Sequence, residues 1–312
     1  MGAIVARGLT KRYGSSVAVD GVSLEVRQGE VVGLLGPDGA GKTTLLRMLC
    51  AVLSPDAGTA QVAGADTREA PEQVKARIGY MPQAFALYDD LTVRENLRFV
   101  AEMFGVPRAL IGPRMDRLLA AGRLQAAADR LAGHLSGGMR QKLALAATVM
   151  HEPEVLVLDE PTTGVDPVSR REFWEILYDL NRQGKTILVA TPYMDEAERC
   201  ARVALMHQGR LLAVEAPRTL RARMPGVILE VVAAPRRAAL QRARELPGVI
   251  RAHLFGHALH AVVSRDADGP RLREALTAQG IVVESVRAVE PSLEDVFVAL
   301  LATHPGHDDT RH

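Results

Sequence analysis

One segment near the start of the chain is more informative than any other: Gly36-Pro37-Asp38-Gly39-Ala40-Gly41-Lys42-Thr43. It matches the pattern G-x-x-x-x-G-K-[ST], and it lies between the apolar run Val31–Leu35 and an apolar-periodic stretch that starts at Thr44 and reaches Leu53. This context predicts a loop between a strand and a helix, where backbone N–H groups and the helix dipole can hold a phosphate. A glycine turn that binds nothing is the competing interpretation, and the lysine and the hydroxyl in register argue against it.

The two residues that end this segment carry chemistry of their own. In a phosphate loop Lys42 reaches the β- and γ-phosphates of a nucleotide, and the Thr43 hydroxyl ligates Mg²⁺. We therefore expect a nucleoside triphosphate with Mg²⁺ to bind along Gly36 to Thr44. Asp38 stands at a variable position of the pattern and has no assigned role.

A second apolar run ends in two carboxylates. Val155 to Leu158 predicts a buried parallel strand, and Asp159 and Glu160 follow it directly. Ligands of open α/β sheets sit at this end of the strands. Asp159 is the expected ligand of hydrated Mg²⁺, and Glu160 is the candidate general base for an attacking water. Acidic strand ends are also common without any function, being capped or solvated.

The run His134-Leu135-Ser136-Gly137-Gly138-Met139-Arg140-Gln141-Lys142 precedes this strand. With the phosphate loop and Asp159-Glu160, it makes the chain resemble the ATP-binding-cassette (ABC) ATPases from about Val5 to Glu215. The family signature is Leu-Ser-Gly-Gly-x-x-Gln, and here it opens a helix expected over Met139 to Met150. The resemblance implies that Ser136, Gly137, Gly138 and Gln141 cover ATP held by a second subunit, so that two ATPs lie between two cassettes.

The resemblance assigns three further residues. Gln83 matches the glutamine that touches Mg²⁺ or the attacking water, so it is both a candidate catalytic residue and a candidate metal ligand. Tyr13 matches the aromatic residue that stacks on adenine, and an ordinary core or surface tyrosine is the competing interpretation. Asp166 matches an aspartate that crosses the dimer interface, and Asp before Pro is also an ordinary helix start.

One position departs from the family. After the apolar strand Thr186–Thr191, the family places a histidine that contacts the γ-phosphate, and this chain has Pro192. Proline has neither a donor nor a basic atom, so it cannot make that contact. Either hydrolysis depends wholly on Glu160, or this cassette is slow and works beside a better partner.

Composition indicates a globular protein without a nucleic-acid or disulfide role. The chain has 312 residues, 47% hydrophobic content, a formal charge of +1 and two cysteines. Near-neutral charge argues against a nucleic-acid binder, and two cysteines in apolar or helical contexts argue against a disulfide scaffold. Without a spanning apolar stretch or a signal-like N-terminus, we expect a cytoplasmic protein, peripheral on the inner face of the membrane, whose membrane work is done by separate permease subunits.

Breaks in the pattern predict two domains. The ABC ATP-binding domain is expected over 1–222, with a helical subdomain at about 84–150 in which Thr92 caps a helix. Phe85, Leu87 and Tyr88 in the loop leading into it are either docking groups for a membrane partner or the packing of that loop. No repeat of the cassette is visible, which argues against a fused double ATPase.

The second domain is expected over 226–303, with a flexible tail at 304–312. Strand patterns at 227–232, 249–254, 258–263 and 281–286 alternate with helical patterns at 235–245 and 270–279. This β-α-β-β-α-β order predicts a ferredoxin-like α+β domain. The run Pro291-Ser292-Leu293-Glu294-Asp295-Val296-Phe297 resembles a stretch near the C-terminus of ABC ATPases that drive exporters. Four arginines on the first helix of this domain are expected to form a solvated face: Arg236, Arg237, Arg242 and Arg244.

The sequence thus favours an α/β ABC ATPase core with an antiparallel β subdomain and a helical subdomain, followed by a small α+β domain. The expected function is the ATP-hydrolysing subunit of an ABC exporter that works by ATP-driven closure of a homodimer or heterodimer. Two alternatives stay open: a slow or non-hydrolysing regulatory cassette, and a soluble ABC ATPase not linked to transport.

Overall fold

The computed structural model describes residues 2–84, 87–224, 226–264 and 268–303. The chain divides after Glu215 into two compact units. Helix α8 (Pro217–Ala222) belongs to the second unit, so the first unit ends at Glu215 rather than at residue 222. The residues beyond 303, where the sequence suggests a flexible tail, lie outside the described part, as does Phe85.

A six-stranded sheet forms the centre of the first unit, in the order β10-β9-β3-β8-β7-β6. Its strands are β3 (Val31–Leu35), β6 (Ile78–Met81), β7 (Val155–Asp159), β8 (Thr186–Thr191), β9 (Arg202–His207) and β10 (Arg210–Glu215). All but β10 run parallel. Every residue of β3, β7 and β8 is buried, which explains their uninterrupted apolar sequences. The loops after these three strands therefore leave the sheet at one edge.

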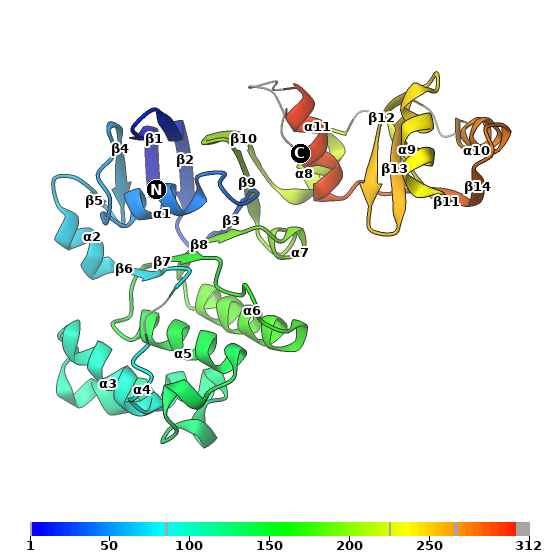
Figure 1. The fold of residues 1–312 in the computed structure, drawn as a ribbon. Helices are drawn as coiled ribbons and strands as arrows, with labels where there is room; N and C mark the ends of the chain where they lie inside the picture. The colour runs from blue at the N-terminus through cyan, green and yellow to red at the C-terminus, as the bar shows by residue number, and fades with distance from the viewer. Residues whose placement is uncertain (1, 85–86, 225, 265–267, 304–312) are drawn as a thin grey trace. The chain divides into compact units, whose positions relative to one another are not determined.

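A second, antiparallel sheet has the order β2-β1-β4-β5. It consists of β1 (Gly2–Tyr13), β2 (Ser16–Arg27), β4 (Ala57–Val62) and β5 (Ala65–Asp66). Helix α1 (Lys42–Leu49) packs between this sheet and the central one, as Figure 1 shows. It begins two residues before the expected Thr44 and ends before Leu53. Helix α2 (Pro71–Arg77) leads into β6.

Helices α5 (Gly137–Val149) and α6 (Pro167–Arg182) lie against the other face of the central sheet. Helices α3 (Val93–Met103) and α4 (Arg108–Gly122) pack on α5, and short 3-10 turns lie at Gln125–Ala127 and Ala132–His134. The predicted cap at Thr92 is confirmed: its hydroxyl accepts from Glu95 N, and the Glu95 carboxylate accepts from Thr92 N, which closes a capping box. A separate apolar core lies beneath α3, α4 and α5.

The second unit has the predicted ferredoxin-like fold. Its sheet has the order β12-β13-β11-β14, with antiparallel neighbours throughout. The elements are β11 (Val227–Ala234), α9 (Arg236–Glu245), β12 (Val249–Phe255), β13 (Ala258–Val263), α10 (Asp268–Ala278), β14 (Val282–Val289) and α11 (Leu293–Thr303). Alternating apolar residues of the sheet pack against α9 and α10. Helix α11, which the sequence pattern did not predict, contacts α8 within this unit.

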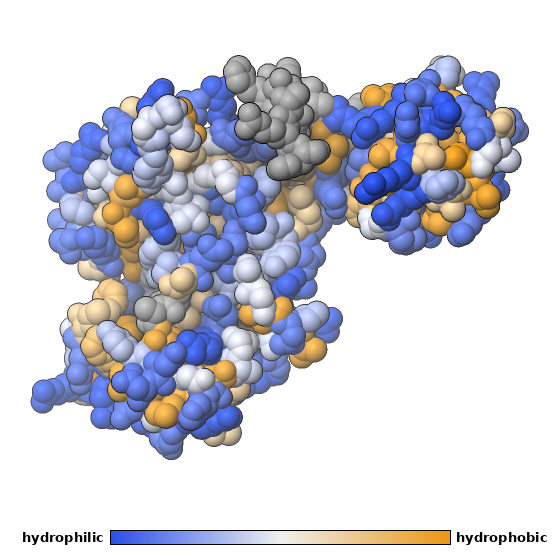
Figure 2. All heavy atoms as spheres, viewed as in Figure 1, coloured by the Kyte–Doolittle hydropathy of each residue, from blue (hydrophilic) through white to orange (hydrophobic). Residues whose placement is uncertain are grey.

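The surface of the first unit is mostly hydrophilic in the view of Figure 2, with apolar residues over the region of α3 and α4. Five large apolar side chains there are at least 40% exposed: Leu110 of α4, and four in or next to α3, which are Tyr88, Phe99, Met103 and Phe104. We call these four the helical-segment patch. Among the described residues, the helices are all too short or too polar to cross a membrane.

Candidate active site

The loops at the sheet edge enclose a cavity of about 450 Å³. The phosphate-loop segment, Gln83 after β6, Glu160 after β7 and Pro192 after β8 all reach it. Its lining residues are Ala18, Asp38, Gly39, Ala40, Gly41, Lys42, Thr43, Thr44, Gln83, Glu160, Thr163, Pro192 and Tyr193. Segments from five separate parts of the chain thus meet where the sequence predicts phosphate chemistry.

Close packing and backbone geometry explain two glycines of the loop. A Cβ on Gly36 would lie 2.3 Å from Met206 O, and a Cβ on Gly41 would lie 2.2 Å from Ala18 O. Gly41 also has φ 102°, a conformation open to glycine alone in practice. Among the described residues, no side chain caps the start of α1 at Gly41, so its first N–H groups are free to bind a phosphate.

Lys42 is buried at the base of the cavity. Its Nζ donates to Gly36 O at 2.8 Å and to Pro37 O at 3.1 Å, and it lies 3.1 Å from Glu160 Oε1. The loop carbonyls therefore fix the ammonium beside the position where a phosphate would enter.

Glu160 is held by three neighbours. Besides Lys42, Gln83 Nε2 donates to Glu160 Oε2 at 3.2 Å, and Thr163 Oγ1 donates to the same oxygen at 3.3 Å. Strand β7 ends at Asp159, and Glu160 turns out of it with φ 51°, a strained value for a non-glycine residue. The turn brings the carboxylate of Glu160 to the cavity, where it can accept a proton from water.

Asp159 is the structure's strongest indication of a metal ion. The side chain is fully buried, and neither carboxylate oxygen has a hydrogen-bond partner among the described residues. Burial raises the pKa of Asp159 above its ordinary value, and the nearby Thr43 hydroxyl acts in the opposite direction. A buried, unpartnered carboxylate beside a hydroxyl fits the hard oxygen ligands of Mg²⁺. Asp159 and Thr43 would hold the ion, which would supply positive charge against the phosphates.

The Pro192 loop is fixed on both sides. Tyr193 N donates to Thr191 Oγ1 at 3.0 Å, and Thr191 Oγ1 donates to Glu196 Oε2 at 2.7 Å. Glu196 is fully buried and also accepts from Thr162, just after β7. Pro192 therefore faces the cavity from a held position, where the family has its histidine.

Sequence reasoning missed Glu196 and its partner Arg170. Arg170 Nε lies 3.6 Å from Glu196 Oε1, and the guanidinium lies 4.3 Å from the centre of the Tyr193 ring. This network ties the ends of β7 and β8 together. In the sequence Glu196 is one of several charged residues at a helix start, and only its burial in the fold distinguishes it from them.

The other expected ligands lie outside this cavity. Tyr13 ends β1 with its side chain half exposed, so its ring is open for stacking. Ser136 caps α5, accepting from Met139 N at 3.3 Å, and Asp166 caps α6, accepting from Ser169 N at 3.0 Å. The backbone bond from Ser169 is the main reason why the pKa of Asp166 is lowered.

Gly137, Gly138 and Gln141 follow Ser136 in α5 and do not line the cavity either. Gly138 has a packing reason as well, since a Cβ there would lie 2.5 Å from Ser169 Cβ. The signature residues of one chain thus do not reach its own phosphate loop.

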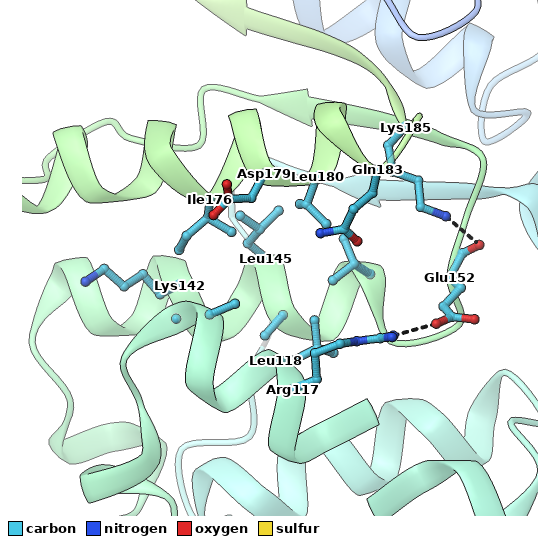
Figure 3. Close-up of a pocket in the computed structure, with 14 residues that line it drawn as sticks. Arg117, Leu118, Lys142, Leu145, Glu152, Ile176, Asp179, Leu180, Gln183 and Lys185 are labelled. Atoms are coloured by element: carbon cyan, nitrogen blue, oxygen red, sulfur yellow. Dashed lines mark hydrogen bonds and ion pairs between the residues drawn. The ribbon is translucent and has the colours of Figure 1, made fainter. Parts of the chain in front are cut away.

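A second cavity, of about 300 Å³, lies between α4, α5 and α6. Figure 3 shows Arg117 and Lys185 both directed at Glu152, with an ion pair to its carboxylate and a hydrogen bond to its carbonyl. This cavity contains no glycine loop and no free carboxylate pair, so it does not compete as the nucleotide site.

Comparisons with known families agree with this arrangement. Residues 19–163 match the family described as "ABC transporter", and residues 216–301 match "ATP-binding protein DrrA1-3-like, C-terminal domain". The chain is 42% identical to the probable multidrug ABC transporter ATP-binding protein YbhF of Escherichia coli K12 over 96% of its own length, but it spans only 52% of that protein. It is 40% identical to the daunorubicin resistance ATP-binding protein DrrA2 of Streptomyces coeruleorubidus, covering 96% of this chain and 94% of that protein.

Solved structures show the same fold. An ATP-binding subunit of an ABC transporter matches with a TM-score of 0.65 and 29% identity, over 71% of this chain and 92% of that one. A dimeric ATP-binding cassette bound to ADP and Pi matches with a TM-score of 0.63 and 25% identity, over 68% and 98%. The chain therefore belongs to the ABC transporter family, as an ATP-binding cassette followed by a DrrA-like C-terminal domain.

Proposed function

We propose that this chain binds and hydrolyses Mg-ATP to power export of a small molecule through separate membrane subunits. One observation carries the proposal: Lys42, the Asp159-Glu160 pair and Gln83 converge on the glycine loop, with Glu160 only 3.1 Å from the Lys42 ammonium. An incoming γ-phosphate would compete with Glu160 for the Lys42 ammonium and break their ion pair. The released carboxylate would then be positioned to polarise water against that phosphate.

The distribution of the expected ligands supports a dimer. Ser136 and its neighbours offer an exposed helix start that does not line the chain's own cavity. A second cassette, identical or related, would bring this start to the nucleotide and complete the site, as the dimeric form of the neighbour bound to ADP and Pi suggests. Closure around ATP and opening after hydrolysis would supply the mechanical cycle.

The helical-segment patch is the proposed contact with the membrane subunits. Tyr88 and Phe99 form an edge-on ring pair at 4.9 Å, and Met103 follows Phe99 by one helical turn. Leu87, by contrast, packs against the apolar core beneath these helices, so it serves the loop's own packing. This surface would place the chain on the cytoplasmic face of the membrane.

Relatives named for multidrug transport, daunorubicin resistance and Nod factor export make small-molecule export the favoured class. The test is co-purification with a membrane subunit encoded beside this chain, followed by ATPase assays with and without it. We expect the wild-type chain to associate with the membrane subunit and its ATP turnover to be stimulated. Met103→Ser should lose both properties. Val52→Ser is the control, because Val52 is similarly exposed but lies outside the helical-segment patch, and it should behave as wild type. Full activity without association would favour a soluble ATPase not linked to transport.

A slow or regulatory cassette is the second candidate, and one observation favours it. Pro192 lines the cavity where the family's histidine would contact the γ-phosphate. ATP binding and dimer closure without measurable hydrolysis, alone or with the membrane partner, would support this role and exclude the first.

A further inference from the structure

The second unit buries three potential metal ligands together. His253 lies on β12, His260 on the neighbouring β13, and Asp295 in the first turn of α11. Their ligand atoms lie within 4.8 Å of one another; Asp295 and His260 are almost completely removed from solvent, and the side chain of His253 is 12% exposed. Asp295 Oδ1 is 2.7 Å from His260 Nδ1 and 3.1 Å from His253 Nε2.

The 3.1 Å separation between His253 Nε2 and Asp295 Oδ1 is close to the edge of a metal coordination shell, whereas His260 Nδ1 and Asp295 Oδ1 lie at hydrogen-bond distance and would move apart around an ion. Zinc bonds to imidazole nitrogen and carboxylate oxygen of about 2.0–2.2 Å place neighbouring tetrahedral ligands roughly 3.3 Å apart. We propose that His253, His260 and Asp295 bind a divalent metal ion such as Zn²⁺, with water as the fourth ligand. Two imidazoles and one carboxylate form a donor set typical of such ions.

Unpartnered nitrogens support a ligand at this position. Among the described residues, neither ring nitrogen of His253 makes a hydrogen bond of ordinary geometry, although Nε2 lies beside Asp295. In His260, by contrast, Nδ1 is hydrogen-bonded to Asp295 Oδ1, and the buried Nε2 on the other side of the ring has no hydrogen-bond partner among the described residues. Buried polar atoms without partners are costly, and a metal ion would satisfy the nitrogen that faces Asp295.

The surrounding residues fix the ligands as outer-sphere partners do. Asp295 Oδ2 accepts from Ser292 N at 2.8 Å and from Ser292 Oγ at 2.6 Å, which leaves Oδ1 for the metal. His260 stacks on Phe255 with ring centres 4.1 Å apart, and its Nε2 faces Glu230 Oε2 at 3.8 Å. Such carboxylates orient ligating histidines in metal sites.

The three residues bring together two parts of the second unit, the β12-β13 hairpin and α11. A bound ion would connect α11 to the β12-β13 hairpin, which Arg251 already joins through the Val298 carbonyl.

The test uses the full chain, freed of metal by a chelator and kept without nucleotide. Zn²⁺ titrated in competition with a chromophoric chelator should reveal a site with a dissociation constant below about 1 μM. His253→Gln should weaken that site at least about tenfold. His257→Gln, an exposed position in the turn of the same hairpin, is the matched control and should leave it unchanged.

Co²⁺ provides a readout that needs no variant. Bound to the wild-type chain, it should show the visible absorption of tetrahedral coordination by nitrogen and oxygen. A wild-type chain without a submicromolar zinc site or without this spectrum overturns the proposal. A folded His253→Gln variant that binds Zn²⁺ as tightly as wild type also overturns it. The cluster would then be a hydrogen-bonded support for α11.

Discussion

Replacing Pro192 by histidine should accelerate ATP hydrolysis by this chain. Pro192 lines the cavity with Lys42 and Glu160, and the bonds from Tyr193 N to Thr191 and from Thr191 to Glu196 hold the loop on which it stands. An imidazole there would be directed at the region of the γ-phosphate, where negative charge develops in the transition state.

The size of the effect follows from that single contact. A hydrogen bond to a charged group contributes about 1.5–3 kcal/mol, which corresponds to roughly ten- to 150-fold in rate. Losing the proline should lower stability by about 0.4–1 kcal/mol, because the unfolded chain gains conformational freedom while the folded loop stays held. The gain should be in kcat rather than KM, since the contact strengthens as the reaction proceeds.

The assay is initial-rate phosphate release at saturating Mg-ATP, with Pro192→Ala as the control that removes the proline without adding an imidazole. A histidine variant no faster than the alanine variant, both being folded by circular dichroism, would refute the reasoning. The phosphate contact would then be dispensable in this cassette.

Three further predictions concern the same cavity. Lys42→Ala should weaken ATP binding at least tenfold, about 1.4 kcal/mol, in a titration with fluorescent nucleotide; unchanged affinity in a folded variant would contradict the assigned role. Asp159→Asn should raise Tm of the Mg²⁺-free protein at about pH 8 and weaken Mg²⁺-dependent ATP binding. Burial raises the folded-state pKa of Asp159, so the stability that the protonated carboxyl contributes is present below the unfolded pKa and is lost as pH rises through the folded pKa. The neutral amide of asparagine avoids that loss. A Tm equal to wild type across pH would refute that linkage. Glu196→Gln should lower the free energy of unfolding by about 1–3 kcal/mol in urea, because Arg170 loses its buried partner; a change below about 0.5 kcal/mol would mean that the network stabilises nothing.

Local signals made much of the fold predictable. The apolar runs that form β7 and β8 are long enough and sufficiently uniform to specify buried parallel strands, and Thr92 indicated a helix start. The alternation beyond residue 226 gave the order of the second unit, and the sheet order β12-β13-β11-β14 confirms the ferredoxin-like prediction. Helix α11 was missed even though Ser292 and Asp295 form a capping box at its start.

Contacts between distant segments could not be read in the same way. The phosphate loop and Glu160 were found because each stands in a motif, whereas the Glu160 contacts with Lys42 and Gln83 needed the fold. His253, His260 and Asp295 carry no spacing pattern, because Asp295 reaches the histidines only through the packing of α11 on the sheet. Burial of an ionisable group is a tertiary property, and local sequence patterns alone do not specify it.

The most direct test of the account is the behaviour of Glu160→Gln with Mg-ATP. The amide keeps the size of the side chain and its contact distance to Lys42 but removes the proton acceptor, so hydrolysis should fall by roughly 10²–10⁴-fold while ATP remains bound. Glu154→Gln, exposed just before the same strand, is the control and should hydrolyse normally. Size-exclusion chromatography should then show a stable ATP-bound dimer for Glu160→Gln and not for Glu154→Gln. Normal turnover by this variant, or a monomer that holds ATP, would contradict the account.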